Sequence, residues 1–268
     1  MKKHMRYTLP ILLFIFAQAV SAQVFRTLCN DGIKHIANRN YRNAAECFQK
    51  ATEEYSTEQE KTYAFANLAY SQQMCGELHK ALKSYNNAIG NDMNKVALMS
   101  QRANILLQLD SLERALEEYN LILEKEPTNA GALFFRAGIY SETERYNEAR
   151  ADYIKLLSLE PENDNVKLGL AMLYKNENKL NESLTLLTML IESNPERAEY
   201  YIARSNIERL MGHTELALLD VEKAIELEPT NGNHYTLQAI LYERLGKRDA
   251  AKKSRINATK YNNVSVND

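Results

Sequence analysis

The stretch AGALFFRAGIYSETERYNEARADYIKLLSLEPEN, residues 130–163, decides the fold. Its thirty-second residue is Pro161, and proline returns at the same spacing of 34 residues at Pro127, Pro195 and Pro229. Proline cannot continue a helix interior, so each one marks the end of one helix and the approach to another. The sequence therefore predicts a repeat of 34 residues.

This register divides residues 23–268 into seven repeats, in which positions are counted from the first residue. The repeats are 25–61, 62–95, 96–129, 130–163, 164–197, 198–231 and 232–265, and the first has three extra residues. Asn129, Asn163 and Asn231 each follow a repeat proline by two residues. Asparagine is a favoured N-cap, so we expect a new helix to begin after each of them.

Positions 8 and 20 test the register independently, because every residue there is Ala, Gly or Ser. Position 8 holds Gly32, Ala69, Ala103, Ala137, Ala171, Ser205 and Ala239, and position 20 holds Ala44, Ala81, Ala115, Ala149, Ser183, Ala217 and Ala251. Small residues are what two helices need where they cross closely. Each repeat should contain two such helices.

A turn is predicted near position 15 of each repeat. That position holds Gly76, Asp110, Glu144, Asn178, Gly212 and Gly246. Gly and Asn suit the left-handed residue that follows a helix. We therefore predict fourteen helices in antiparallel pairs and no sheet.

The pattern AGIY at 137–140, YNEA at 146–149 and EP at 160–161 resembles the tetratricopeptide repeat family. The resemblance implies an all-α, right-handed solenoid whose concave wall is lined by the first helix of each repeat. It also implies protein or peptide partners. A coiled coil is excluded as the alternative, because breakers every 34 residues prevent sustained heptads.

Residues 1–22 have the composition of a secretory signal peptide. Lys2, Lys3 and Arg6 precede a short apolar run, and small residues lead to a predicted cleavage site between Ala22 and Gln23. A transmembrane anchor is the alternative, but the run is short for a bilayer core of about 30 Å. We expect an exported protein, periplasmic or secreted, with no membrane insertion after cleavage.

The charge of the chain gives no reason to expect a polyanionic partner. The formal net charge is −2, and removal of residues 1–22, which contain three basic and no acidic groups, brings it to −5. Nucleic-acid binding is therefore not expected.

The sequence contains no recognisable catalytic pattern. It lacks a glycine-rich phosphate loop, a G-x-S-x-G elbow, an H-E-x-x-H helix and a C-x-x-C pair. The histidines outside the leader are scattered over different repeats, at His35, His79, His213 and His234. We expect no enzymatic activity, no metal site and no cofactor.

The three cysteines are an odd number for an oxidising compartment. Cys29 and Cys47 fall on opposing helices of the first repeat, so a disulfide between them is conceivable. The favoured interpretation is that Cys29, Cys47 and Cys75 are small apolar core residues.

The resemblance places positions 2, 5, 9, 12 and 13 of each first helix on the concave wall. We take seven residues there as candidate partner-binding groups, hereafter the predicted groove residues: Tyr70, Asn104, Phe134, Leu168, Met172, Ile202 and Asn206. Apolar groups would supply affinity and the asparagines would bond a partner's backbone. The alternative for the position-5 residues is packing between stacked repeats.

Positions 7 and 23 carry opposite charges in three repeats. The pairs, 16 residues apart, are Arg102 with Glu118, Arg136 with Asp152, and Arg204 with Asp220. Antiparallel helices joined near position 15 bring positions 7 and 23 together, so we predict three structural ion pairs. The register leaves open whether each acid instead reaches the arginine of a neighbouring repeat.

Two classes of function fit these observations. The first is a non-catalytic interaction scaffold or adaptor of the cell envelope that binds a peptide segment or a partner helix. The second is an accessory subunit or small-ligand receptor that uses the superhelix interior as a pocket.

Overall fold

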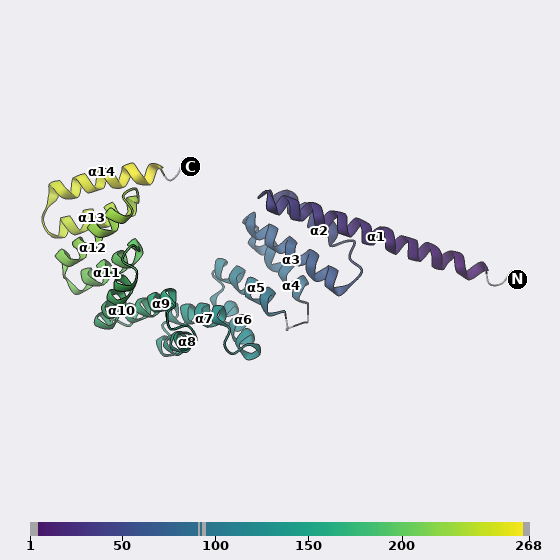
Figure 1. Cartoon of the computed structure of the whole chain (residues 1–268), viewed down its shortest axis with the longest axis horizontal. Coiled ribbons are helices and arrows are strands. Elements are labelled where there is room, and N and C mark those ends of the chain that lie inside the picture. The colour runs from purple at the N-terminus through teal and green to yellow at the C-terminus, as the bar shows by residue number, and fades with distance from the viewer. Residues whose placement is uncertain (1–4, 91, 93–94, 265–268) are drawn as a thin grey trace. The chain divides into compact units, whose positions relative to one another are not determined.

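The structure, a computed structural model, describes residues 5–90, 92 and 95–264, with side chains from residue 20 to residue 262. Within these residues it contains fourteen helices and no strand. The chain forms two compact units, Met1–Ala132 and Leu133–Asp268, here called the N-terminal and C-terminal units (Figure 1).

In the N-terminal unit each helix packs on the next one along the chain. Its helices are α1 (Met5–Ala37), α2 (Tyr41–Ala51), α3 (Glu58–Met74), α4 (Leu78–Ile89), α5 (Val96–Gln108) and α6 (Leu112–Lys125). The odd-numbered helices are the predicted first helices of the repeats. Helix α1 begins 20 residues before the first repeat, so it passes through the predicted cleavage site.

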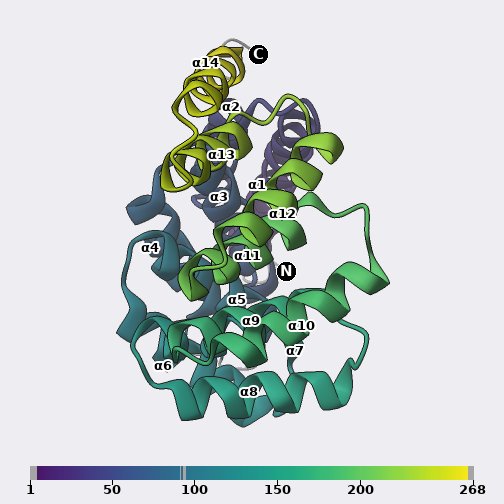
Figure 2. The same cartoon turned by 90° about the vertical axis from the view of Figure 1, so that its left-hand side faces the viewer.

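The C-terminal unit repeats the same arrangement, and its antiparallel pairs are visible in Figure 2. Its helices are α7 (Ala130–Glu142), whose first residues belong to the N-terminal unit, α8 (Tyr146–Leu159), α9 (Asp164–Asn176), α10 (Leu180–Ser193), α11 (Ala198–Met211), α12 (Thr214–Leu227), α13 (Gly232–Arg244) and α14 (Arg248–Val264). The prediction of an all-α repeat solenoid is confirmed.

The turns follow the predicted chemistry. All six residues named at position 15 have φ between +54° and +85°, and so does Arg39, which holds position 15 of the first repeat. In the connections between repeats, Asn129 accepts a hydrogen bond from Ala132 N and Asn163 accepts one from Val166 N, as N-caps do. Local sequence therefore fixes both ends of the hairpins.

The small residues lie where the helices cross. All fourteen residues at positions 8 and 20 are buried. A Cβ added to Gly32 would come 2.6 Å from the Phe48 ring, which shows how closely α1 and α2 approach. The two serines are satisfied across the crossing, because Ser183 donates to Ala171 O and Ser205 to Ala217 O, both at 2.8 Å.

The cysteine prediction is partly wrong. Cys29 is buried and Cys47 is half-buried, but Cys75 is exposed at the C-cap of α3, where the helix turns back. All three thiols are free, so Cys29 and Cys47 form no disulfide in this structure.

Candidate functional site

The position-5 residues of α9 and α11 belong partly to the core. Leu168 and Ile202, together with Met172 at position 9 of α9, are half-buried and pack on one cluster of buried residues. That cluster consists of Ala171, Leu187, Leu190, Ile191, Ala198, Tyr200, Tyr201, Ile207 and Ala224. These three predicted groove residues therefore combine packing with an exposed part.

Phe134 and Asn206 are also half-buried in the C-terminal unit. Phe134 lies edge-on to Phe135 and Tyr153, with ring centroids 5.7 and 6.1 Å away. Asn206 donates to Ile202 O at 3.0 Å, within its own helix. Its amide is thus partly engaged by the helix that carries it.

The other two predicted groove residues lie in the N-terminal unit. Tyr70 is 37% exposed and its ring stands edge-on to Tyr41 at 6.2 Å. Asn104 is half-buried and accepts a hydrogen bond of 2.9 Å from the Tyr119 hydroxyl. Tyr70 has the freer side chain of the two.

The three arginine–carboxylate pairs lie across single hairpins. In each pair the arginine Nε and Nη2 donate to the two carboxylate oxygens. The Nη2 distances are 2.6 Å to Glu118, 2.8 Å to Asp152 and 2.7 Å to Asp220. This parallel arrangement is the geometry that arginine favours with carboxylates. The side chains of all three acids are nearly buried.

Arg102 and Arg204 also reach the preceding hairpin. Arg102 Nη1 donates to Asn86 Oδ1 at 3.0 Å, and Arg204 Nη1 donates to Thr188 Oγ1 at 3.4 Å. Sequence reasoning missed these contacts, although Asn86 and Thr188 share position 25. The arginines therefore join helices within a repeat and between repeats.

Repeats without an ion pair fill positions 7 and 23 in other ways. Ser254 donates to Gln238 at 2.7 Å, which is an uncharged version of the same contact. In the 164–197 repeat the two positions hold Leu170 and Leu186. The hairpin geometry therefore tolerates charged, polar and apolar pairs.

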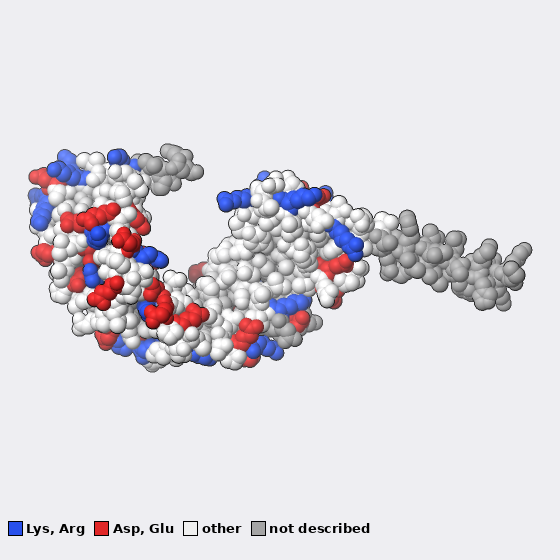
Figure 3. Space-filling view, in the orientation of Figure 1, with Lys and Arg blue, Asp and Glu red and all other residues white. Residues whose placement is uncertain are grey.

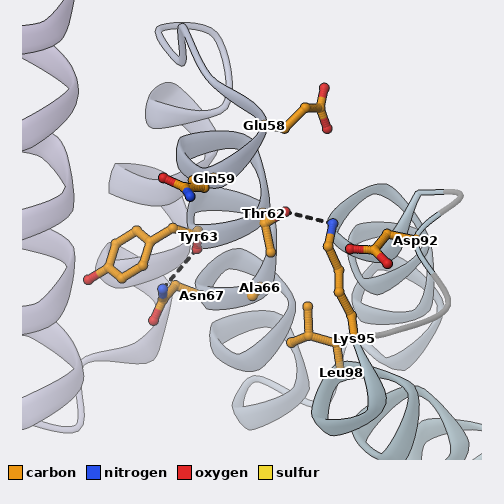
Figure 4. Close-up of a pocket in the computed structure, with 9 residues that line it drawn as sticks. All are labelled: Glu58, Gln59, Thr62, Tyr63, Ala66, Asn67, Asp92, Lys95 and Leu98. Carbon is orange, nitrogen blue, oxygen red and sulfur yellow. Dashed lines mark hydrogen bonds between the residues drawn. The ribbon is translucent and has the colours of Figure 1, made fainter. Parts of the chain in front are cut away.

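A pocket of about 670 Å³ opens beside α3 in the N-terminal unit. We call it the α3–α5 pocket, and Figure 4 shows the nine residues that line it: Glu58, Gln59, Thr62, Tyr63, Ala66, Asn67, Asp92, Lys95 and Leu98. Thr62 and Ala66 lie centrally on α3, with Tyr63 and Asn67 to one side and Lys95 and Leu98 to the other. Its volume is within the range of about 300–1,000 Å³ found for ligand pockets.

Lys95 lines one side of this pocket and is held there by three hydrogen bonds. Its ammonium donates to Thr62 Oγ1 and Ala88 O at 2.8 Å and to Ile89 O at 3.2 Å. The two carbonyls end α4, so the lysine charge also opposes the negative end of that helix. Lys95 thereby ties the α4–α5 connection to α3.

The sequence contained one signal of this pocket. At position 32, where the next four repeats have proline, the 62–95 repeat has Met93. Its connection starts instead with Gly90 at φ +58°. The missing proline therefore indicated that the α4–α5 connection differs from the others, but it did not predict the contacts of Lys95.

Charged side chains of both signs are interspersed on the visible face of each unit, and few lie over α3 and α5 (Figure 3). No helix among the described residues is long and apolar enough to cross a membrane. Within the same residues, no three His, Cys, Asp or Glu side chains gather as metal ligands would. His213 and His234 instead contact Glu208 and Glu228.

Two tetratricopeptide repeat family models match the chain, one over residues 140–207 and one over residues 198–231. This part of the chain therefore consists of tetratricopeptide repeats. No curated protein sequence matches the chain.

Solved structures support the same fold over a longer stretch. A tetratricopeptide repeat protein from Parabacteroides merdae is 24% identical with a TM-score of 0.80, over 89% of this chain and 93% of that chain. PilW, described as a type IV pilus biogenesis factor, is 17% identical with a TM-score of 0.65, over 72% and 90%. MamA from Desulfovibrio magneticus RS-1 is 16% identical with a TM-score of 0.58, over 63% and 96%.

Proposed function

We propose that this chain is an exported, non-catalytic scaffold that binds a peptide segment or a partner helix on the first helices of its repeats. The observation that carries the proposal is the partial exposure of Phe134, Leu168, Met172 and Ile202 on α7, α9 and α11. Apolar side chains that stay half-exposed after packing can contribute to a partner interface.

The nearly buried carboxylates support a structural rather than a catalytic role. Glu118, Asp152 and Asp220 each accept two hydrogen bonds from an arginine. A carboxylate held in this way is engaged in compensating a desolvated arginine. The ion pairs are therefore proposed to orient the hairpins.

A capture experiment from cell-envelope extracts tests the scaffold. The purified protein should retain stoichiometric protein partners, and Phe134→Ala and Ile202→Ala should weaken their retention. If both variants retain the partners fully while the free energy of unfolding falls by the ~2–5 kcal/mol typical of core truncation, these side chains serve packing only.

The second candidate function is a small-ligand receptor or an accessory subunit. The volume of the α3–α5 pocket, about 670 Å³, favours it. A rise in melting temperature with a metabolite or a glycan, in the absence of stoichiometric protein partners, would support the receptor over the scaffold.

Export is tested separately by the N-terminus of the protein recovered from the producing cells. Mass spectrometry should find a chain that begins at Gln23. A chain that retains residues 1–22 would contradict cleavage and leave the binding proposal untouched.

A further inference from the structure

We propose that the α3–α5 pocket binds a protein segment in which an apolar side chain stands next to a lysine or an arginine. This inference rests on the proposed scaffold function and names the chemistry of one partner segment. None of the nine lining residues is a predicted groove residue, although Ala66 holds position 5 of its repeat, as Phe134, Leu168 and Ile202 do in theirs.

The apolar part of the segment is matched by the centre of the pocket. Ala66 presents only a methyl group there, and Leu98 and Tyr63 stand on either side of it. Tyr63 is 43% exposed, although its ring lies edge-on to Phe48. A rigid, half-exposed aromatic ring beside a small residue is well suited to receive an aliphatic or aromatic side chain.

The basic part is matched by the rim. The three protons of the Lys95 ammonium are directed at the neutral acceptors Thr62 Oγ1, Ala88 O and Ile89 O, so the lysine keeps its charge but has no donor left for a ligand. Glu58 has a side chain that is 79% exposed, with a long contact of 3.4 Å to Lys61, and Asp92 is exposed on the same rim. The Glu58 carboxylate, which is the more exposed partner of its long contact with Lys61, would repel an incoming carboxylate and attract an ammonium or a guanidinium.

The amides on α3 favour an extended chain over a small molecule. Gln59 and Asn67 are eight residues apart on one helix, which corresponds to about 12 Å along its axis. That distance is roughly the length of four extended residues. The amide group of Asn67 donates to Tyr63 O at 2.8 Å, which orients it beside the pocket. Two amides at this spacing can bond the backbone on both sides of an inserted side chain.

The test is a selection of random 12-residue peptides displayed against the purified protein, followed by affinity measurements with the enriched peptide. We expect enrichment of an apolar residue adjacent to lysine or arginine. Ala66→Trp fills the pocket and should weaken binding about tenfold or more, as loss of an interface hot spot does. Ala151→Trp, at an exposed alanine of α8 in the other unit, is the matched control.

A charge reversal tests the rim without enlarging any core residue. Glu58→Lys should weaken the basic peptide several-fold, and a peptide with glutamate in place of its lysine should regain affinity for this variant. Glu182→Lys is the control, because Glu182 is also an exposed first-turn glutamate, on α10. It changes the helix terminus equally and should leave binding unchanged.

The remaining outcomes separate the two proposals. Acidic enriched peptides, equal affinity of Ala66→Trp and the original protein, or equal effects of the two charge reversals would overturn the pocket inference. Peptides that ignore Ala66→Trp but lose affinity with Ile202→Ala would overturn it and leave the scaffold function standing. The absence of any enriched peptide would overturn the pocket inference, and the capture experiment would still decide the scaffold function.

Discussion

Arg136 and Asp152 form two parallel hydrogen bonds across one hairpin, Nε to Oδ2 at 2.7 Å and Nη2 to Oδ1 at 2.8 Å. The Asp152 side chain is only 7% exposed and that of Arg136 is 21% exposed. Removing the acid alone leaves a poorly solvated cation, so Asp152→Leu should lower the free energy of unfolding by about 3 kcal/mol.

The double variant Arg136→Leu with Asp152→Leu should recover much of that loss. Leu170 and Leu186 occupy the same two positions in the 164–197 repeat, which shows that leucine is accommodated there. Urea unfolding of the original protein, both single variants and the double variant gives the coupling energy. Losses that simply add would contradict a coupled pair.

Two glycines should respond in opposite directions to the same substitution. Gly32→Ala places a methyl group 2.6 Å from the buried Phe48 ring and should cost roughly 1–3 kcal/mol. Gly138→Ala lies within α7, where a new Cβ has nothing within 4 Å, and should stabilise by about 0.5–1 kcal/mol. Thermal unfolding of both variants measures the contrast, and equal shifts would contradict the close crossing of α1 and α2.

The three thiols should react in a fixed order. Burial, and to a lesser degree the nearby Glu60 charge, raise the pKa of Cys29 to about 11, so its thiolate fraction at pH 8 is very low. Cys75 is exposed. Iodoacetamide labelling followed by mass spectrometry should therefore modify Cys75 first and Cys29 last. Early labelling of Cys29 in the folded protein would contradict its placement in the core.

Acid should weaken the C-terminal unit partly through Glu228. Hydrogen bonds from Asn231 and then His234 lower the pKa of this carboxyl. A carboxyl with a lowered pKa stabilises the fold above its unfolded pKa of about 4.3, and the contribution disappears as pH falls through the folded pKa. Glu228→Gln should thus lose less stability between pH 6 and pH 3 in urea unfolding. If Glu228→Gln and the original protein lose the same stability between pH 6 and pH 3, the Glu228 carboxylate contributes nothing to the acid response.

The hairpins were predictable because their determinants repeat at short range. The position-15 turns and the Arg102–Glu118 contact each involve residues of one repeat. The position of a residue in the repeat therefore predicts which residue it faces across the hairpin. The closeness of helices at Gly32 and Ala44 follows from the same pattern. Residue type and spacing are sufficient for such contacts.

The α3–α5 pocket was not predictable because it depends on an exception to the repeat. The contacts of Lys95 with Ala88 O and Ile89 O arise from a connection that lacks the repeat proline. A register describes what the repeats share, so it gives no geometry for a loop that differs. The extent to which Leu168 and Ile202 are buried was also not predictable, because they pack on residues of neighbouring helices.

Helix α1 runs unbroken through the bond between Ala22 and Gln23, and the Ser21 hydroxyl donates to Glu54 O and Oε2. Because cleavage of a folded chain must proceed through local opening, a leader peptidase would act on this bond either before α1 forms or when α1 opens. Helices form in about 0.1–1 μs once the chain is free to fold. The proposed cleavage would therefore compete kinetically with folding of the first repeat, and a chain that folds first would be cut at the rate at which α1 opens.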